Sequence, residues 1–201
     1  MKIYVESNFV IEMAVGQEEA SFCDSLLKMS AEGLLELSIP AFSILEPYQT
    51  LERRRRDRAE LHRRLQAELD QIARAAELSS DVAALRGALG IIVSSADHDI
   101  EAIEDLRKRI TRQLDVIPLD AAVLRGASQL QADFGLSAPD AVVAASVLAD
   151  LALHRDERAY FVTRNSKDFG DPDVMALFKA SGCTVLFSFD TAVQIAQTLT
   201  D

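Results

Sequence analysis

Short apolar runs alternate along the chain with longer segments in which apolar residues recur at helical spacing. The runs are rich in β-branched and aromatic residues, as strands buried on both faces usually are. Because such strands alternate with helices, the pattern predicts an α/β fold with a parallel sheet of about five strands flanked by helices. The predicted strands are KIYV at 2–5, LELSIP at 35–40, DVIPL at 115–119, AYFVT at 159–163 and CTVLF at 183–187.

The helical segments have recognisable boundaries. Gly33 and Gly135 follow the last periodic residue of a helix, where glycine commonly ends one. Pro47 predicts a break or kink because proline lacks the backbone N–H that a helix interior needs. The segment GIIVSSADHD at 90–99 is compatible with a short strand or a turn. The predicted helices cover 18–32, about 41–77, 81–89, 100–113, 120–134, 137–153, 172–182 and 192–199.

The segment from about 51 to 113 is charged and carries almost no strand signal. We therefore expect a single domain over 1–201 with a helical insertion at about 51–113. One stripe of apolar residues in it has spacings of four, four and three, enough for one apolar helix face. That face suits packing within the chain and, as an alternative, contact with a protein partner or a second copy. Its members are Leu61, Leu65, Leu69 and Ile72.

The formal net charge is -11, and an acidic protein repels phosphate at long range. One segment differs: residues 53–64 hold seven arginines against Asp57 and Glu60. Such a segment serves either as a nucleic-acid surface or as a solvated helix face laced with ion pairs.

Several classes of protein are disfavoured. Two distant cysteines indicate neither a disulfide framework nor a zinc site, and no apolar run is long enough to span a membrane. The N-terminus lacks the pattern of a signal peptide, so we expect a cytoplasmic protein. A Gly-rich phosphate loop, a nucleophile elbow and a His-Glu-x-x-His helix are all absent.

Four acidic residues are placed near strand ends. Glu6 follows the first strand, Glu46 lies in the helix after the second, and Asp140 lies in the helix before the fourth. Asp168 comes just after the fourth strand. Ligands of parallel sheets bind outside the carboxyl ends of the strands, where clustered carboxylates would repel one another without cations. Oxygen ligands of this kind suit Mg²⁺ or Mn²⁺ and metal-assisted phosphodiester hydrolysis.

Each acid also has a purely structural explanation. Glu6 could favour a helix whose cap is the following Ser or Asn, and Asp140 stands at capping-box spacing from Ser137. Asp168 could cap a turn, and a helix glutamate such as Glu46 is uninformative alone. Only the joint placement of the four favours a site.

These residues carry a resemblance to the PIN-domain superfamily of metal-dependent nucleases, which includes the ribonucleases of bacterial toxin–antitoxin pairs. IYVESNFVIEMA at 3–14 resembles the opening strand and acid-Thr-Asn turn, and LSAPDAVVAASVLA at 136–149 the acid-bearing helix. The segment from Tyr160 to Phe187 resembles the closing strand, its Thr-x-Asp/Asn turn and the final strand. Glu46 fits the helix-borne glutamate of the family more loosely. The resemblance covers about the first 50 and the last 85 residues.

The resemblance implies a metal-dependent endoribonuclease, in a toxin or RNA-processing role, with Mg²⁺ or Mn²⁺ as cofactor. Glu6, Glu46, Asp140 and Asp168 would bind the metal and carry catalysis, supported by Ser7, Asn8, Thr163 and Asn165. We further predict that Arg53, Arg54, Arg55 and Arg56 line a groove that leads RNA to the acids. Expected partners are RNA and, in the toxin role, an antitoxin-like inhibitor protein; a homodimer is a further expectation.

Three positions depart from the family pattern. The family usually has Asp at Glu6 and Thr at Ser7, and many relatives have an acid at Asn165. A glutamate carries its carboxylate one methylene further out. The alternative function is therefore a PIN-like module with weakened catalysis that acts by binding protein or RNA.

Overall fold

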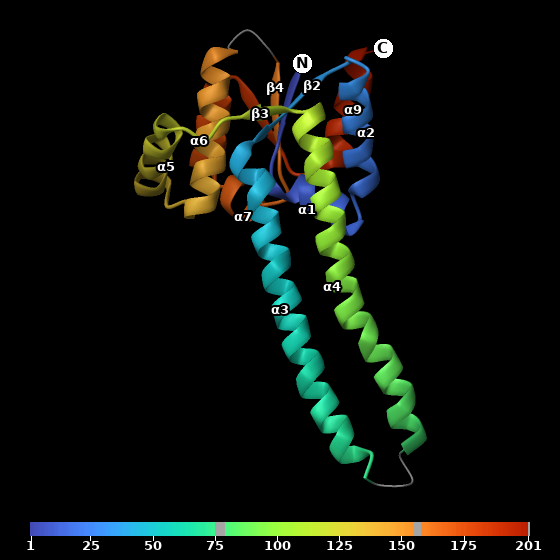
Figure 1. The fold of residues 1–201 in the computed structure, drawn as a ribbon. Helices are drawn as coiled ribbons and strands as arrows, with labels where there is room; N and C mark the ends of the chain where they lie inside the picture. The colour runs from blue at the N-terminus through green and yellow to red at the C-terminus, as the bar shows by residue number, and fades with distance from the viewer. Residues whose placement is uncertain (75–78, 155–157, 201) are drawn as a thin grey trace. The chain divides into compact units, whose positions relative to one another are not determined.

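The structure, a computed structural model, describes residues 1–74, 79–154 and 158–200. The chain divides into two compact units (Figure 1). One consists of Met1–Pro47 and Leu106–Asp201, and the other of Tyr48–Asp105. The first unit holds the sheet and all four predicted acids.

The first unit is built on a five-stranded parallel sheet in the order β3-β2-β1-β4-β5. This confirms the predicted α/β fold. The central strand β1 aligns Ile3 with Leu37 on one side and with Tyr160 on the other. The strands are β1 (Lys2–Val5), β2 (Glu36–Pro40), β3 (Asp115–Ile117), β4 (Ala159–Val162) and β5 (Cys183–Leu186).

Helices cover both faces of the sheet. On one face α2 packs against β2 and α9, and α9 packs against β4 and β5; on the other, α6 packs on β2 and β3 and α8 on β5. Strands covered in this way bury side chains of both faces, which explains their apolar sequences. The helices of this unit are α1 (Ser7–Val15), α2 (Ala20–Ala31), α5 (Ala121–Phe134), α6 (Ala138–Leu153), α7 (Ser166–Phe169), α8 (Pro172–Ala180) and α9 (Phe189–Thr200).

An aromatic cluster fixes the end of β4 against α7 and α8. The ring of Phe161 stacks on Phe178 with centroids 5.1 Å apart, and Phe169 meets Phe161 edge-on at 4.9 Å. All three side chains are fully buried. Burying three aromatic side chains contributes several kcal/mol, so the turn between β4 and α8 is firmly held. That turn carries Thr163, Asn165 and Asp168.

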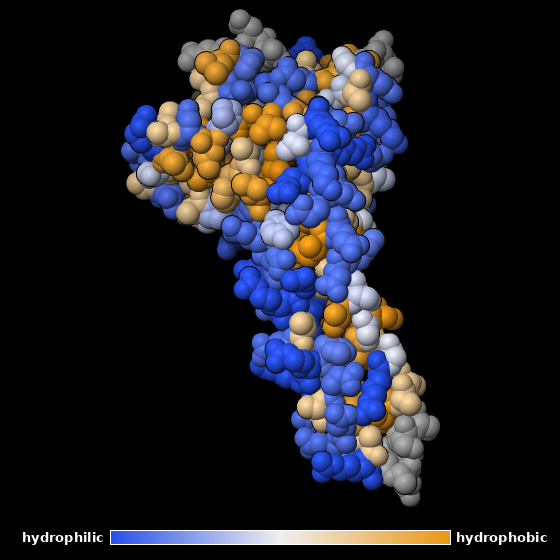
Figure 2. All heavy atoms as spheres, viewed as in Figure 1, coloured by the Kyte–Doolittle hydropathy of each residue, from blue (hydrophilic) through white to orange (hydrophobic). Residues whose placement is uncertain are grey.

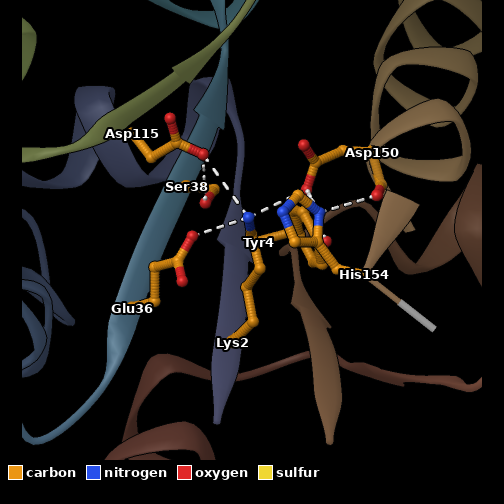
Figure 3. Close-up of polar contacts among 7 residues, drawn as sticks. All are labelled: Lys2, Tyr4, Glu36, Ser38, Asp115, Asp150 and His154. Carbon is orange, nitrogen blue, oxygen red and sulfur yellow. Dashed lines mark hydrogen bonds and ion pairs between the residues drawn. The ribbon is translucent and has the colours of Figure 1, made fainter. Parts of the chain in front are cut away.

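A buried lysine organises the opposite, N-terminal edge of the sheet (Figure 3). Lys2 begins β1 and is only 1% exposed, and its Nζ lies 2.6 Å from Glu36, 3.0 Å from Asp150 and 3.4 Å from Asp115. Burial lowers the pKa of Lys2, but its bonds to Glu36 and Asp150 outweigh that and raise it overall. Tyr4 donates its hydroxyl to Asp150 at 2.7 Å. The positive charge that pairs with the acids of this edge is therefore supplied by a side chain of the protein, that of Lys2.

Two long helices, α3 (Ala41–Ile72) and α4 (Ser79–Gln113), supply the second unit, which contains their residues 48–72 and 79–105. We call these two segments the helix pair. Ion pairs of Arg58 with Asp99 and of Arg86 with Asp70 join them along their length in antiparallel order. Leu69 is buried in the pair, but Leu61 and Ile72 of the predicted stripe are 48% and 43% exposed.

The sequence predicted a break or kink at Pro47 and a strand or turn at 90–99, and the helix is interrupted at neither place. Helix α3 runs through Pro47, whose fixed φ is itself helical, so the residue removes one hydrogen bond without ending the helix. The segment 90–99 is helical throughout and belongs to α4. Within it Ala96 and Asp99 continue the buried face begun by Val82, so packing against α3 overrides the β-branched signal at 91–93. The predicted end of the first long helix near 77 lies outside the described residues.

None of the described helices is by itself long and apolar enough to cross a membrane. The pair α5 and α6 meets that length and composition only when joined across a bend of 118°. Both helices contribute to the core of the first unit, through Val123, Ala127, Val143 and Val147 among others.

Candidate functional site

Two of the four predicted acids, Glu6 and Asp140, are linked by a chain of hydrogen bonds at the carboxyl edge of the sheet, and a third, Glu46, is bonded to the residue next to Glu6. Thr163 connects Glu6 to the turn after β4, and Asn165 connects that turn to Asp140. Glu46 joins through Ser7, the residue after Glu6. These residues follow β1 and β4 or lie in α1, α3 and α6, which are far apart in sequence, so the parallel strand order brings them together.

Glu6 is the most buried carboxylate of the site, with 6% of the residue exposed. It is itself the N-cap of α1 and accepts from the backbone N–H of Asn8 at 3.1 Å and from the side chain of Asn8 at 2.5 Å. Thr163 Oγ1 donates to it at 3.0 Å. Burial and then the charge of Glu46 raise the pKa of Glu6 to about 7, against the effect of these hydrogen bonds.

The cap of α1 differs from the structural alternative that the sequence offered for Glu6. In that alternative Ser7 or Asn8 would cap the helix, with Glu6 beside it. Instead the Glu6 side chain performs the capping, and Ser7 turns its hydroxyl to Glu46. The capping and functional explanations of Glu6 therefore coexist, because one carboxylate has room for several donors.

Glu46 is half-buried on α3 and accepts a hydrogen bond from Ser7. Three residues earlier, and therefore on the same side of the helix, lies Ser43. Ser43 is fully buried, and its hydroxyl oxygen has no hydrogen-bond partner, the one such side-chain atom among the described residues. A buried hydroxyl of this kind calls for a partner from outside the chain, such as water.

Asp140 lies in the first turn of α6, and the backbone there has the predicted capping geometry. Ser137 caps the helix and accepts from the backbone N–H of Asp140 at 3.3 Å, while its hydroxyl donates to the Asp140 carboxylate. The other carboxylate oxygen accepts from Asn165 Nδ2 at 3.0 Å. Asp140 is thus both part of a capping motif and joined to the turn after β4.

Asp168 stands apart from this chain of hydrogen bonds. Its backbone N–H donates to Asn165 Oδ1 at 3.3 Å, which makes Asn165 the cap of α7. The Asp168 carboxylate makes no hydrogen bond or ion pair within the ranges that the structure describes. It is not the cap of the helix that follows either, because Asp171 caps α8. Within the described residues, the Asp168 carboxylate therefore makes no contact that would explain it as a structural residue.

The donors at this edge fit a hard divalent cation, but the side chains are not drawn together around one point. Their carboxylate and hydroxyl oxygens are the ligands that Mg²⁺ and Mn²⁺ prefer. Among the described residues, however, no group of three His, Cys, Asp or Glu side chains is arranged to hold a metal ion. Ser7, Thr163 and Asn165 lie between the acids and take up oxygens that a cation would share.

Comparison with known proteins supports the fold. No protein-family model matches the chain, and no curated protein matches it. Among solved structures, the chain is similar to VapBC2 from Rickettsia felis, which was determined bound to a DNA fragment from its promoter. The TM-score is 0.50 at 11% identity, over 92% of this chain and 98% of that one. At this identity the likeness concerns the fold alone.

A charged pair beside the site was not predicted from the sequence. Arg164 lies between Thr163 and Asn165 and forms ion pairs with Glu12, which is almost fully buried, and with Glu18 at 3.7 Å. These residues and Asn8 line an open pocket of about 480 Å³. The signal for it was weak, since Arg164 and Glu12 are 152 residues apart, and the acid pattern after β4 drew attention to the carboxylates there and not to the arginine among them.

The four side chains of the predicted arginine run, residues 53–56, point in different directions around α3. Arg55 pairs with Glu52 and Asp97, and Arg56 donates to the backbone oxygen of Glu52. Arg53 and Arg54 have no partner among the described residues. Consecutive helix residues are about 100° apart, so four in a row cannot face one groove together. The run and the acids belong to different units, and the predicted groove between them stays a prediction.

Proposed function

We propose that the protein is a metal-dependent nuclease that hydrolyses RNA phosphodiester bonds at the carboxyl edge of its sheet. The observation that carries the proposal is the linked group of Glu6, Glu46 and Asp140, in which no basic side chain takes part within the described residues. The fold likeness and the resemblance of the motifs to PIN nucleases support it.

The acids need a positive partner that the chain does not provide there. A buried glutamate with a pKa of about 7 costs free energy when ionised, and a neighbouring carboxylate adds to that cost. A divalent cation offsets both effects. Glu6, Glu46 and Asp140 would hold Mg²⁺ or Mn²⁺, with Asp168 available as a further ligand because its carboxylate makes no hydrogen bond or ion pair to the described residues.

The neighbouring side chains have supporting roles. Ser7 orients Glu46, while Asn8 and Thr163 orient Glu6 and keep its carboxylate in one rotamer. Asn165 holds Asp140 and shapes the far side of the site. When bound, the metal would activate water and stabilise the charge that develops on the phosphate and the leaving oxygen. The chain itself positions the acids and excludes water around Glu6.

The proposal is tested by cleavage of end-labelled single-stranded and structured RNAs with Mg²⁺, Mn²⁺ or chelator. Wild type is compared with Asp140→Asn, which removes the carboxylate charge at constant size. Asp133→Asn is a matched control, since Asp133 lies on α5 and, among the described residues, its carboxylate is hydrogen-bonded to Gln129 alone. We expect metal-dependent cutting by wild type and the control, and a loss of at least about 100-fold in Asp140→Asn.

Cutting that both Asp variants retain would contradict the assignment of the site. If no protein cuts any RNA and none binds Mn²⁺, the second candidate is favoured, a PIN-like module that binds protein or RNA without catalysis. A specific observation favours that candidate: the described acids are not gathered around one point. In a toxin role, an inhibitor protein would be a further partner of the active nuclease.

A further inference from the structure

Six of the seven arginines of α3 fall into two groups that differ in direction and in partners, and Arg54 belongs to neither. At about 100° per residue, Arg53, Arg56, Arg63 and Arg64 share an arc of about 100° on the helix. Arg55 and Arg58 lie outside that arc and form ion pairs with Asp97 and Asp99 of α4. The second group therefore joins the two helices, and the first, which we call the arginine stripe, lies on another side of α3.

The arginine stripe is exposed and only partly neutralised. Arg53 and Arg63 make no hydrogen bond or ion pair in the described ranges, and Arg56 donates only to a backbone oxygen. Arg64 alone has an acidic partner, Glu60, and is 76% exposed. Asp57 lies at the margin of the stripe. Figure 2 shows strongly hydrophilic side chains along the edge of the helix pair where Figure 1 places α3.

The chemistry of the stripe suits phosphate groups. All seven basic residues of 53–64 are arginine and none is lysine, and the planar guanidinium binds phosphate oxygens in a bidentate manner. From Arg53 to Arg63 the helix rises about 15 Å, the length of about four phosphates at 3.4 Å each. The stripe holds no large apolar side chain between these residues, whereas a protein partner would need such anchors.

We infer that the arginine stripe of α3 binds the phosphodiester backbone of a nucleic acid, without reading its bases. This rests on the proposed nuclease function for its biological purpose, although binding does not depend on cleavage. In this inference the nucleic-acid surface consists of the arginine stripe, whose residues share one side of the helix, and no longer of the consecutive run Arg53–Arg56. Arg54 and Arg55 do not belong to the surface.

The test is the salt dependence of binding of the full chain to labelled single-stranded RNA and DNA of equal length, in chelator so that nothing is cut. The double variant Arg53→Gln/Arg63→Gln removes two stripe charges. Arg55→Gln/Arg86→Gln is the matched control, because it removes two paired arginines that are 46% and 42% exposed. Circular dichroism checks that both variants keep the helix content of wild type.

Each stripe arginine lost should lower the slope of log K against log salt by about 0.7. The stripe variant should thus lose about 1.4 in slope and about 25-fold in affinity at 0.1 M salt, and the control should change little. Equal RNA and DNA effects would show backbone binding, and an effect on one alone would identify the source of the phosphates. Equal losses in both variants, or no binding by wild type, would overturn the inference.

The outcome is separable from that of the nuclease proposal. Binding that the stripe variant weakens, without any cleavage, would keep the inference and remove the nuclease. Cleavage that Asp140→Asn abolishes, with no effect of the stripe variant on binding, would keep the nuclease and remove the inference. A stripe that serves an acidic protein would leave nucleic-acid binding unchanged in both variants.

Discussion

Carboxylates gather at both edges of the sheet, but the groups that hold them differ between the two edges. At the N-terminal edge Glu36, Asp115 and Asp150 surround the ammonium of Lys2. At the carboxyl edge Glu6, Glu46 and Asp140 are joined through hydroxyl and amide groups, with no basic side chain in their chain of hydrogen bonds among the described residues.

The difference supports our proposal that the N-terminal edge stabilises the fold and that the carboxyl edge carries the chemistry. Acids that already have a cation from the chain gain little from an added one, and pairing them stabilises the fold. Acids held only by neutral donors keep their negative charge uncompensated, and the raised pKa of Glu6 reports that cost. Active sites commonly keep such unfavourable arrangements because a ligand offsets them.

The largest expected effect lies at the N-terminal edge. Lys2→Met should lower the free energy of unfolding by about 3 kcal/mol, because Asp150, which is 11% exposed, loses its buried cation. Urea unfolding measures the change. Lys28→Met is the matched control, since Lys28 is 68% exposed and its pair with Asp24 is worth at most about 1 kcal/mol. Equal losses would contradict a special role for Lys2.

At the carboxyl edge, removing the charge of Glu6 should raise the free energy of unfolding, and the gain should depend on pH. Because folding raises the pKa of Glu6 to about 7, the folded state binds more protons than the unfolded state between about pH 4.5 and 7. Stability from this group is therefore lost as pH rises. In chelator, Glu6→Gln should gain about 2 kcal/mol relative to wild type between pH 5 and 8. A difference that is flat with pH would refute the assignment.

A further test adds a carboxylate at the carboxyl edge of the sheet. Asn165→Asp keeps the shape and the cap of α7 but places a second charge 3.0 Å from the Asp140 oxygen. In chelator the variant should lose about 1 kcal/mol of stability, and Mn²⁺ should restore it by binding about tenfold more tightly. Thermal unfolding with and without Mn²⁺ measures both. A variant that Mn²⁺ leaves unchanged would argue against a cation at this edge.

The smallest effects come from two serines that each donate to an acid. Ser7→Ala removes the bond to Glu46, and Ser38→Ala removes the 3.2 Å bond to Asp115 at the other edge. Each should cost about 1 kcal/mol. Only Ser7→Ala should change the stabilisation by Mn²⁺, as measured by the shift in thermal unfolding. An equal response of both variants would remove the distinction between the edges.

The sequence predicted the strands well because they are buried on both faces and read as apolar runs. It also placed Glu6, Glu46 and Asp140 correctly relative to strand ends, since parallel strands share one carboxyl edge. The grouping around Lys2 could not be foreseen, because it depends on the register that aligns Lys2 with Glu36 and on the fold position of Asp150.

Prediction from the sequence was less successful for the two long helices. A local signal at 90–99 predicted an interruption, yet contacts between α3 and α4, such as that of Arg58 with Asp99, hold α4 continuous there. The ion pairs of Arg55 with Asp97 and of Arg58 with Asp99 have sequence separations of about 40, so no local pattern could show that these two arginines face α4. The link from Asn165 to Asp140 is likewise a product of packing.

The most direct test of the account is Mn²⁺ binding measured by electron paramagnetic resonance on wild type, Asp140→Asn and Asp115→Asn. The last two variants remove one acid from each edge of the sheet. We predict that wild type and Asp115→Asn bind Mn²⁺ equally and that Asp140→Asn loses at least tenfold in affinity. Equal binding by Asp140→Asn and wild type would contradict a cation site at the carboxyl edge.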